Sequence, residues 1–178
     1  MLGLMQDWPL LIHRVIDYAA IQHPHRAVIS RSVEGPLHRS TYRDVRQRAL
    51  KLAQRLAKDG VKVGDRIGTL AWNGYRHYEL YYGVSGMQAV IHTVNPRLFE
   101  DQIVYIINHA EDRMLFLDLT FVPLLEKIAT EDSRVELVVA GLATHRGQKV
   151  HNQLAGVDHT TERDEVLAFM DADAKPDP

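Results

Sequence analysis

The sequence predicts an α/β fold with a doubly wound, mainly parallel sheet and flanking helices. Two observations favour this fold class. After residue 60, short apolar runs typical of buried strands alternate with segments whose apolar residues recur at helical spacing. The segments that join these runs are roughly a dozen residues or longer, which is the length that a connection between parallel strands needs. Right-handed strand-helix-strand units are therefore expected to build the sheet.

The first helix is expected to begin near Pro9, because proline is favoured in the first turn of a helix. Its predicted buried stripe follows the helical period, and the helix should end before the "HPH" of residues 23–25. Residues 27–32 predict a short strand, and residues 33–39 predict a turn. The predicted stripe of the first helix consists of Leu11, Val15, Tyr18 and Ala19.

A second, longer helix has a clear start and end in the sequence. Thr41 and Asp44 have the spacing of a capping box, and Gly60 lies where a helix C-cap is expected. The apolar residues between them occur at intervals of three or four, which predicts one buried stripe: Val45, Ala49, Leu52 and Leu56.

Beyond Gly60 the alternation predicts strands at 66–72, 89–94, 113–118 and 134–140, with helices at 74–87, 100–110 and 121–129. In the helix at 100–110 the predicted core stripe is Ile103, Ile106, Ile107 and Ala110. From about residue 141 the periodicity fades, although residues 161–170 are compatible with a short helix. We therefore expect an N-terminal α/β subdomain at 1–139, followed by a divergent connector or poorly ordered tail at 140–178.

Composition excludes several classes of function. The 178 residues carry a formal net charge of -2, so no basic field would attract nucleic acid, and no nucleic-acid partner is expected. The absence of cysteine excludes disulfides, thiolate nucleophiles and cysteine metal sites, which is compatible with a cytoplasmic location. No apolar stretch is long and uncharged enough to predict a transmembrane segment.

Common catalytic and nucleotide motifs do not occur in recognisable form. There is no GxGxxG, no Walker loop and no HExxH. Gly83-Val84-Ser85-Gly86-Met87 approaches the GxSxG elbow, but Met87 replaces the last glycine and Ser85 lies in a predicted helix. Close helix packing explains Gly83 and Gly86 better than a nucleophile does, and the scattered histidines lack the spacing of metal ligands.

One group of polar residues follows the predicted strands at their carboxyl ends, where ligands bind in open α/β sheets. Two interpretations stay open for it. Asn73, Asn95 and Asp118 have the character of turn and helix-cap residues, which satisfy free backbone amides. Alternatively, some of these side chains border a ligand, and the candidates for that role are Asn73, His77, His92 and Arg97.

The order of several short motifs resembles a known family. A Thr-Tyr helix start is followed by GVKVGDR, by Trp-Asn with RHYE after it, by HTVNPRL and by INHAED. These residues are similar to the N-terminal portion of AMP-forming acyl-CoA synthetases, within the acyl-adenylate-forming superfamily. The medium- and long-chain fatty acyl-CoA ligase branch is the most similar, and the resemblance covers about residues 1–139. Glu100-Asp101 depart from the proline that the family often has there, although acids also suit a helix N-terminus.

The resemblance implies a reaction that this chain would not complete alone. Family enzymes join a fatty acid to CoA through an acyl-adenylate, using ATP and Mg²⁺, and release AMP and pyrophosphate. The phosphate loop, the adenine motif and the C-terminal lysine of the family are not found in these residues, so no catalytic, cofactor-binding or metal-binding residue is carried over. We expect an inactive fragment that binds no cofactor alone. The alternative is a truncated, non-catalytic paralogue that binds acyl chains or another subunit, and self-association into a dimer is expected.

Overall fold

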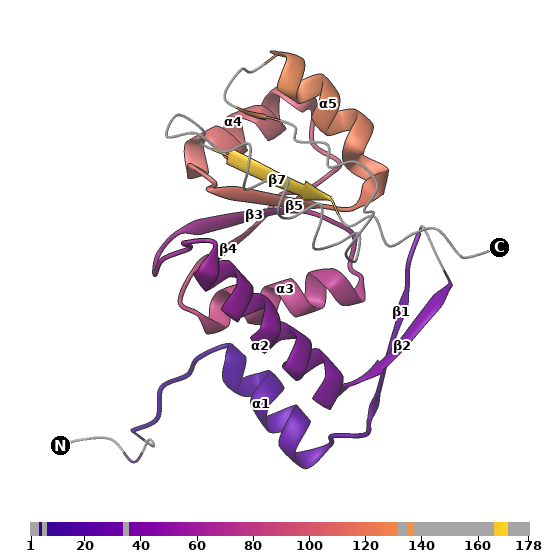
Figure 1. Cartoon of the computed structure of the whole chain (residues 1–178), viewed down its shortest axis with the longest axis vertical. Coiled ribbons are helices and arrows are strands. Elements are labelled where there is room, and N and C mark those ends of the chain that lie inside the picture. Colours follow the sequence, from indigo (N-terminus) through magenta and orange to yellow (C-terminus); the bar gives the residue numbers. More distant parts are fainter. Residues whose placement is uncertain (1–3, 5–6, 34–35, 132–134, 137–165, 171–178) are drawn as a thin grey trace.

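The computed structural model describes residues 4, 7–33, 36–131, 135–136 and 166–170. Figure 1 shows a central sheet with helices α2 and α3 against one face and α4 and α5 against the other, while the hairpin β1-β2 stands beside the α2/α3 side. The helices are α1 (His13–Gln22), α2 (Tyr42–Lys58), α3 (Tyr75–Gly86), α4 (Glu100–Ala110) and α5 (Val122–Glu131), with a 3₁₀ turn at Leu119–Phe121. The strands are β1 (Ala27–Arg31), β2 (Leu37–Thr41), β3 (Arg66–Leu70), β4 (Val90–Thr93), β5 (Met114–Leu117), β6 (Val135–Glu136) and β7 (Val166–Met170).

The central sheet has the order β4-β3-β5-β7-β6, and every neighbouring pair in it is parallel. Helices lie on both of its faces, as a doubly wound sheet requires. The predicted α/β fold class is confirmed.

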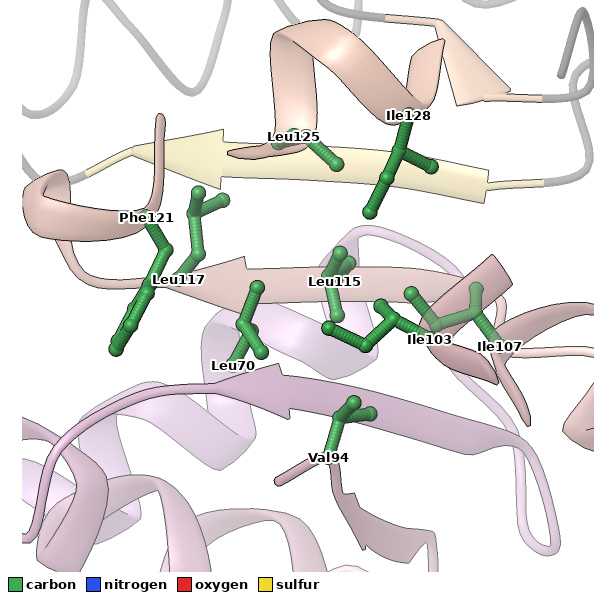
Figure 2. Packing of buried hydrophobic residues seen from close by; sticks show 9 residues of the cluster. All are labelled: Leu70, Val94, Ile103, Ile107, Leu115, Leu117, Phe121, Leu125 and Ile128. Carbon is green, nitrogen blue, oxygen red and sulfur yellow. The ribbon is translucent and has the colours of Figure 1, made fainter. Parts of the chain in front are cut away.

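Two apolar cores cover the two faces of the sheet, and successive residues of β3 alternate between them. Ile67 joins the core under α2 and α3, whereas Leu70 joins the core under α4 and α5. Figure 2 shows the second core, to which β3, β5, α4 and α5 all contribute side chains. The predicted stripe of α4 lies on this side, with Ile103 and Ile107 fully buried.

Helix α2 begins and ends as the sequence predicts. The Asp44 amide donates to Thr41 Oγ1 at 3.3 Å, and the Thr41 amide donates back to Asp44 Oδ2 at 2.9 Å. The Thr41 hydroxyl also donates to the carboxylate, and this bond is the main cause that lowers the Asp44 pKa. At the other end Gly60 has a φ of +80°, the left-handed conformation that closes a helix at low cost to glycine.

The buried face of the first helix was predicted wrongly. Helix α1 begins at His13, and its one fully buried residue is Ile16. The predicted Val15 and Tyr18 are exposed instead, whereas Ile16 is buried and the neighbouring Asp17 lies 2.7 Å from Arg46 of α2. Periodicity predicted a single stripe, and the packing of α1 against α2, which is distant in sequence, buries a different side.

Two predicted segments differ from the observed elements, and a third is described only in part. Within the predicted turn at 33–39, residues from Leu37 onward form β2, which pairs antiparallel with β1. In the expected helix at 161–170, the described residues Val166–Met170 form strand β7 between β5 and β6. A short apolar run suits either element, and pairing on both sides decides for the strand. In the predicted strand at 134–140, Val135–Glu136 are β6, and the other residues lie outside the described part.

Candidate functional site

A pocket of about 450 Å³ opens beside the carboxyl ends of β3 and β4. Its walls come from four places: strand β1, the loop that follows β3, the first turns of α3, and the end of β4. A doubly wound sheet is expected to bind ligands at this end of its strands. The lining residues are Val28, Ile29, Ser30, Asn73, Gly74, Tyr75, His77, Tyr78, Tyr81 and Thr93.

His77 is the ionisable imidazole of this pocket, and a buried hydroxyl holds it. Its Nε2 lies 3.0 Å from Oγ1 of Thr69, a fully buried residue of β3. Burial is the main cause that lowers the pKa of His77, while Asp118 and the Trp72 backbone act in the opposite direction. The imidazole is therefore neutral near pH 7.

Asp118 ties the loop after β3 to the end of β5. Its Oδ2 accepts a hydrogen bond of 2.7 Å from the Trp72 amide, and its Oδ1 lies 3.8 Å from Arg76 Nη1. A second, smaller pocket next to these groups shares Gly74 and His77 with the first. Asp118 thus satisfies a backbone amide, as predicted, but in a loop distant in sequence, and its side chain does not cap the helical turn that follows it.

Three tyrosines of α3 line the pocket, and the sequence analysis did not single them out. Tyr75 stacks on His38 of β2, with ring centroids 3.7 Å apart. Burial, with a hydrogen bond to Tyr82, raises the pKa of Tyr78 to about 12, so this phenol stays protonated at neutral pH. The spacing of Tyr75, Tyr78 and Tyr81 along one side of a helix was the signal that could have identified this wall.

The four candidate residues do not form one site. Asn73 and His77 both line the pocket. His92 pairs in register with Gly68 and therefore faces α4 and α5, where its Nδ1 lies 2.7 Å from Asp112 Oδ2. Arg97 is exposed in the β4-α4 loop. A ligand role for any of the four stays a prediction.

The β4-α4 loop is shaped by Asn95, as its interpretation as a turn residue predicted. Asn95 Oδ1 accepts a hydrogen bond of 3.0 Å from the Arg97 amide, which is the local bond that defines such a turn. Because the bond uses the Arg97 backbone, it places no constraint on the arginine side chain.

The positions of the His, Asp and Glu side chains bear on metal binding. Within the part of the chain that the structure describes, no three His, Asp or Glu side chains converge as a metal site would require. The described residues thus offer no preformed cluster for the Mg²⁺ that the resemblance implies, and no step through a metal is assigned to them. Among the same residues, no helix has the length and apolar character that crossing a bilayer demands.

The sequence matches the model of one protein family, the AMP-binding enzymes, over residues 16–177. The chain is 42% identical to a 3-methylmercaptopropionyl-CoA ligase of Ruegeria lacuscaerulensis over 97% of this chain and 31% of that protein. It is 43% identical to a medium-chain-fatty-acid–CoA ligase of Ectopseudomonas oleovorans over 88% of this chain and 28% of that protein. The chain thus spans less than a third of the length of these relatives. The match continues past residue 139, and the division between 1–139 and 140–178 stays a prediction.

Solved structures have the same fold. A crystal structure assigned as a long-chain-fatty-acid CoA ligase of Rhodopseudomonas palustris matches with a TM-score of 0.59 and 27% identity, over 68% of this chain and 30% of that one. A Mycobacterium tuberculosis fatty acyl CoA synthetase matches with a TM-score of 0.60 at 21% identity, over 66% of this chain and 23% of that one. This second likeness shows a shared fold.

Proposed function

The chain belongs to the AMP-binding enzyme family, and from this premise we propose that it is the N-terminal part of an ATP-dependent fatty acid–CoA ligase. One observation carries the proposal: identity above 40% to CoA ligases extends over nearly all of this chain. The relatives carry names with different acids, so the proposed substrate class is a carboxylic acid with an aliphatic chain. The proposed location is the cytoplasm.

The proposed reaction of the whole protein has two steps. A carboxylate oxygen attacks the α-phosphorus of ATP, the bond to the bridging oxygen breaks, and pyrophosphate leaves. The CoA thiol then attacks the acyl carbonyl and displaces AMP, which leaves a thioester and releases the thiol proton. ATP, Mg²⁺ and CoA would act in the full-length protein, where Mg²⁺ supplies charge stabilisation at the phosphates.

This chain is proposed to be inactive alone and to act as a scaffold. Two ionisable groups of its pocket, His77 and Tyr78, are neutral near pH 7 and offer no charge to a phosphate. The described residues contain no metal site. The chain supplies a sheet with α4 and α5 packed on one face. On the other face, beside α3, it has an open pocket.

A fusion experiment tests the proposal. The chain replaces the matching segment of the Ectopseudomonas oleovorans medium-chain ligase, and thioester formation from octanoate, ATP and CoA is measured. We expect activity from the fusion and none from the 178-residue chain. The fusion carrying Ile107→Asp, which charges the buried core, is the inactive control.

Two outcomes would contradict the proposal. Thioester formation by the isolated chain, lost on heating and absent from a mock preparation, would refute its inactivity. A folded fusion that lacks activity would refute the assignment of this chain as the ligase's N-terminal part.

A second candidate function is subunit interaction, which an apolar surface on α1 favours. Val15, Tyr18 and Ile21 are each more than 60% exposed, and the exposed Leu11 lies just before the helix. Contiguous apolar surface of this kind favours association, and a second copy of this chain is the proposed partner. If so, Val15→Glu shifts the mass measured by light scattering from dimer to monomer, whereas Gln54→Glu on exposed α2 does not. A monomeric native chain at high concentration would eliminate this candidate.

A further inference from the structure

A hydrogen-bonded pair crosses strand β3 on the face covered by α4 and α5. His92 belongs to β4, Asp112 precedes β5, and β3 lies between these two strands. The Nδ1 of His92 is 2.7 Å from Oδ2 of Asp112. The pair passes over Gly68, which is the register partner of His92. Two elements that are not neighbours in the sheet are thus joined directly.

Gly68 leaves the space that this pair occupies. A Cβ atom at Gly68 would lie 2.8 Å from Oδ2 of Asp112 and 2.8 Å from Cδ1 of Leu115. Both distances are far shorter than a van der Waals contact, so any side chain at residue 68 would displace the carboxylate or the core leucine. The close approach therefore requires glycine in the middle of a buried strand, where glycine is otherwise unfavourable.

Asp112 also occupies a position that is normally apolar. Helices α2, α3 and α4 all end with the same hydrogen bond, from the residue that follows a left-handed residue to the carbonyl five positions earlier: Val61 to Leu56, Ala89 to Val84 and Asp112 to Ile107. This position usually makes an apolar contact with the helix, as Val61 and Ala89 do. Asp112 after α4 departs from this preference for an apolar residue. Such departures are common at residues with a special role.

The electrostatic surroundings of Asp112 make His92 its main partner. The side chain is fully buried, and within the described structure its Oδ1 accepts no hydrogen bond. Burial raises the pKa of Asp112, His92 opposes this shift, and Arg66 opposes it less. Arg66 is itself paired with Glu111 at 2.7 Å, and the neighbouring Arg113 with Asp65 at 3.0 Å.

We propose that His92 and the carboxylate of Asp112 form a clamp across β3 that attaches strand β4 to the turn before β5. Among the described strands β4 borders only β3, so its backbone is held along one edge. The clamp gives it a second attachment and thereby positions the carboxyl end of β4, where Thr93 lines the pocket. This conformational role is independent of the ligase activity proposed above.

The native chain provides the first test. If Nδ1 donates to the carboxylate, the neutral imidazole of His92 carries its proton on Nδ1, and nitrogen-15 chemical shifts of the ring report this tautomer. The full 178-residue chain is used, with His92 assigned by comparison with His92→Leu. A neutral ring with its proton on Nε2 would overturn the proposal.

Amide exchange then tests the attachment of β4. In the native chain the Val94 amide donates to Thr69 O at 2.8 Å, and the Arg113 amide donates to Arg66 O at 2.9 Å. In His92→Leu we expect Val94 to exchange at least about tenfold faster, the loss of one hydrogen bond to a charged group, while Arg113 is unchanged. The control His25→Leu, at an exposed histidine, changes neither amide. Equal acceleration at both amides, or at neither, would overturn the clamp.

A second substitution separates the clamp from simple packing. His92→Leu leaves the buried carboxylate without its partner, so its urea midpoint at pH 7 should fall. Adding Asp112→Leu removes that charge, and the double variant should unfold at a higher urea concentration than His92→Leu. If the pair contributed only packing, the second substitution would lower the midpoint further, and the proposal would be wrong.

Discussion

Residues of β3 alternate between two faces of the sheet, and each face holds one of the predicted histidines. On the α2/α3 face, His77 contacts the neutral hydroxyl of Thr69 beside an open pocket. On the α4/α5 face, His92 contacts the fully buried carboxylate of Asp112 inside a closed core. The same residue type therefore contacts a neutral partner on one face of the sheet and an ionisable partner on the other.

The largest effect is expected from a charge placed in the core under α4 and α5. Ile107→Asp places a charge in the core shown in Figure 2 and should cost more than about 4 kcal/mol, enough to abolish folding. Ile106→Asp, at a partly buried residue of the same helix, should have the same effect to a smaller degree. Circular dichroism during urea unfolding provides the measurement. Tyr105→Asp, on the exposed side of α4, is the matched control, and a soluble Ile107→Asp variant that melts cooperatively would contradict this assignment.

On the α2/α3 side of the sheet, a substitution at Gly83 tests how closely α3 packs against α2. A Cβ on Gly83 would lie 2.9 Å from the Ala49 carbonyl oxygen, a backbone atom that yields little. Gly83→Ala should therefore destabilise the protein by about 1–3 kcal/mol, although alanine favours helix by about 1 kcal/mol.

Gly86, one turn further along α3, is the control for this comparison. A Cβ there would meet His13 Cβ at an ordinary 3.6 Å, so Gly86→Ala should be neutral or slightly stabilising. Equal free energies of unfolding for the two variants would show that helix packing does not account for Gly83.

On the α4/α5 face, Asp112 makes the free energy of unfolding depend on pH. Its pKa is raised by burial, so its contribution to stability is fully present below 3.8 and is lost as the pH rises through the higher folded value. Relative to Asp112→Asn, the native chain should therefore lose stability as the pH rises through this window. Urea midpoints at several pH values measure the difference, and a difference that grows in the opposite direction would refute the buried charge.

On the α2/α3 face, His77 should give a smaller pH dependence of stability, with the opposite sign. The pKa of His77 is lowered by burial, so its contribution is present above 6.5 and is lost as the pH falls through the lower folded value. Relative to His77→Gln, which keeps a hydrogen-bonding side chain, the native chain should lose stability on acidification below 6.5. For each variant, the difference in stability from the native chain is plotted against pH. Slopes of the same sign for Asp112→Asn and His77→Gln would contradict the opposite pH dependence of the two faces.

Much of the fold was predictable because its signals are local. The capping box of Thr41 and Asp44, the glycine at residue 60 and the stripe of α4 each depend on residues a few positions apart, and all three are confirmed. The candidate site was predicted less well. All strand ends were treated as one surface, but the side chain of His92 points to the opposite face from the pocket, since it pairs with Gly68 and not with Thr69.

The sequence by itself determined the alternation of strands and helices, where α2 starts and stops, and the motif order that identifies the family. The tertiary structure decided which side of α1 is buried, that residues 166–170 pair as β7, and that His92 meets Asp112 across Gly68. The physical reason is the sequence separation over which each interaction acts. Periodicity and capping act within one or two turns of the chain, whereas burial, strand pairing and a buried ion partner depend on residues that only the folded sheet brings together.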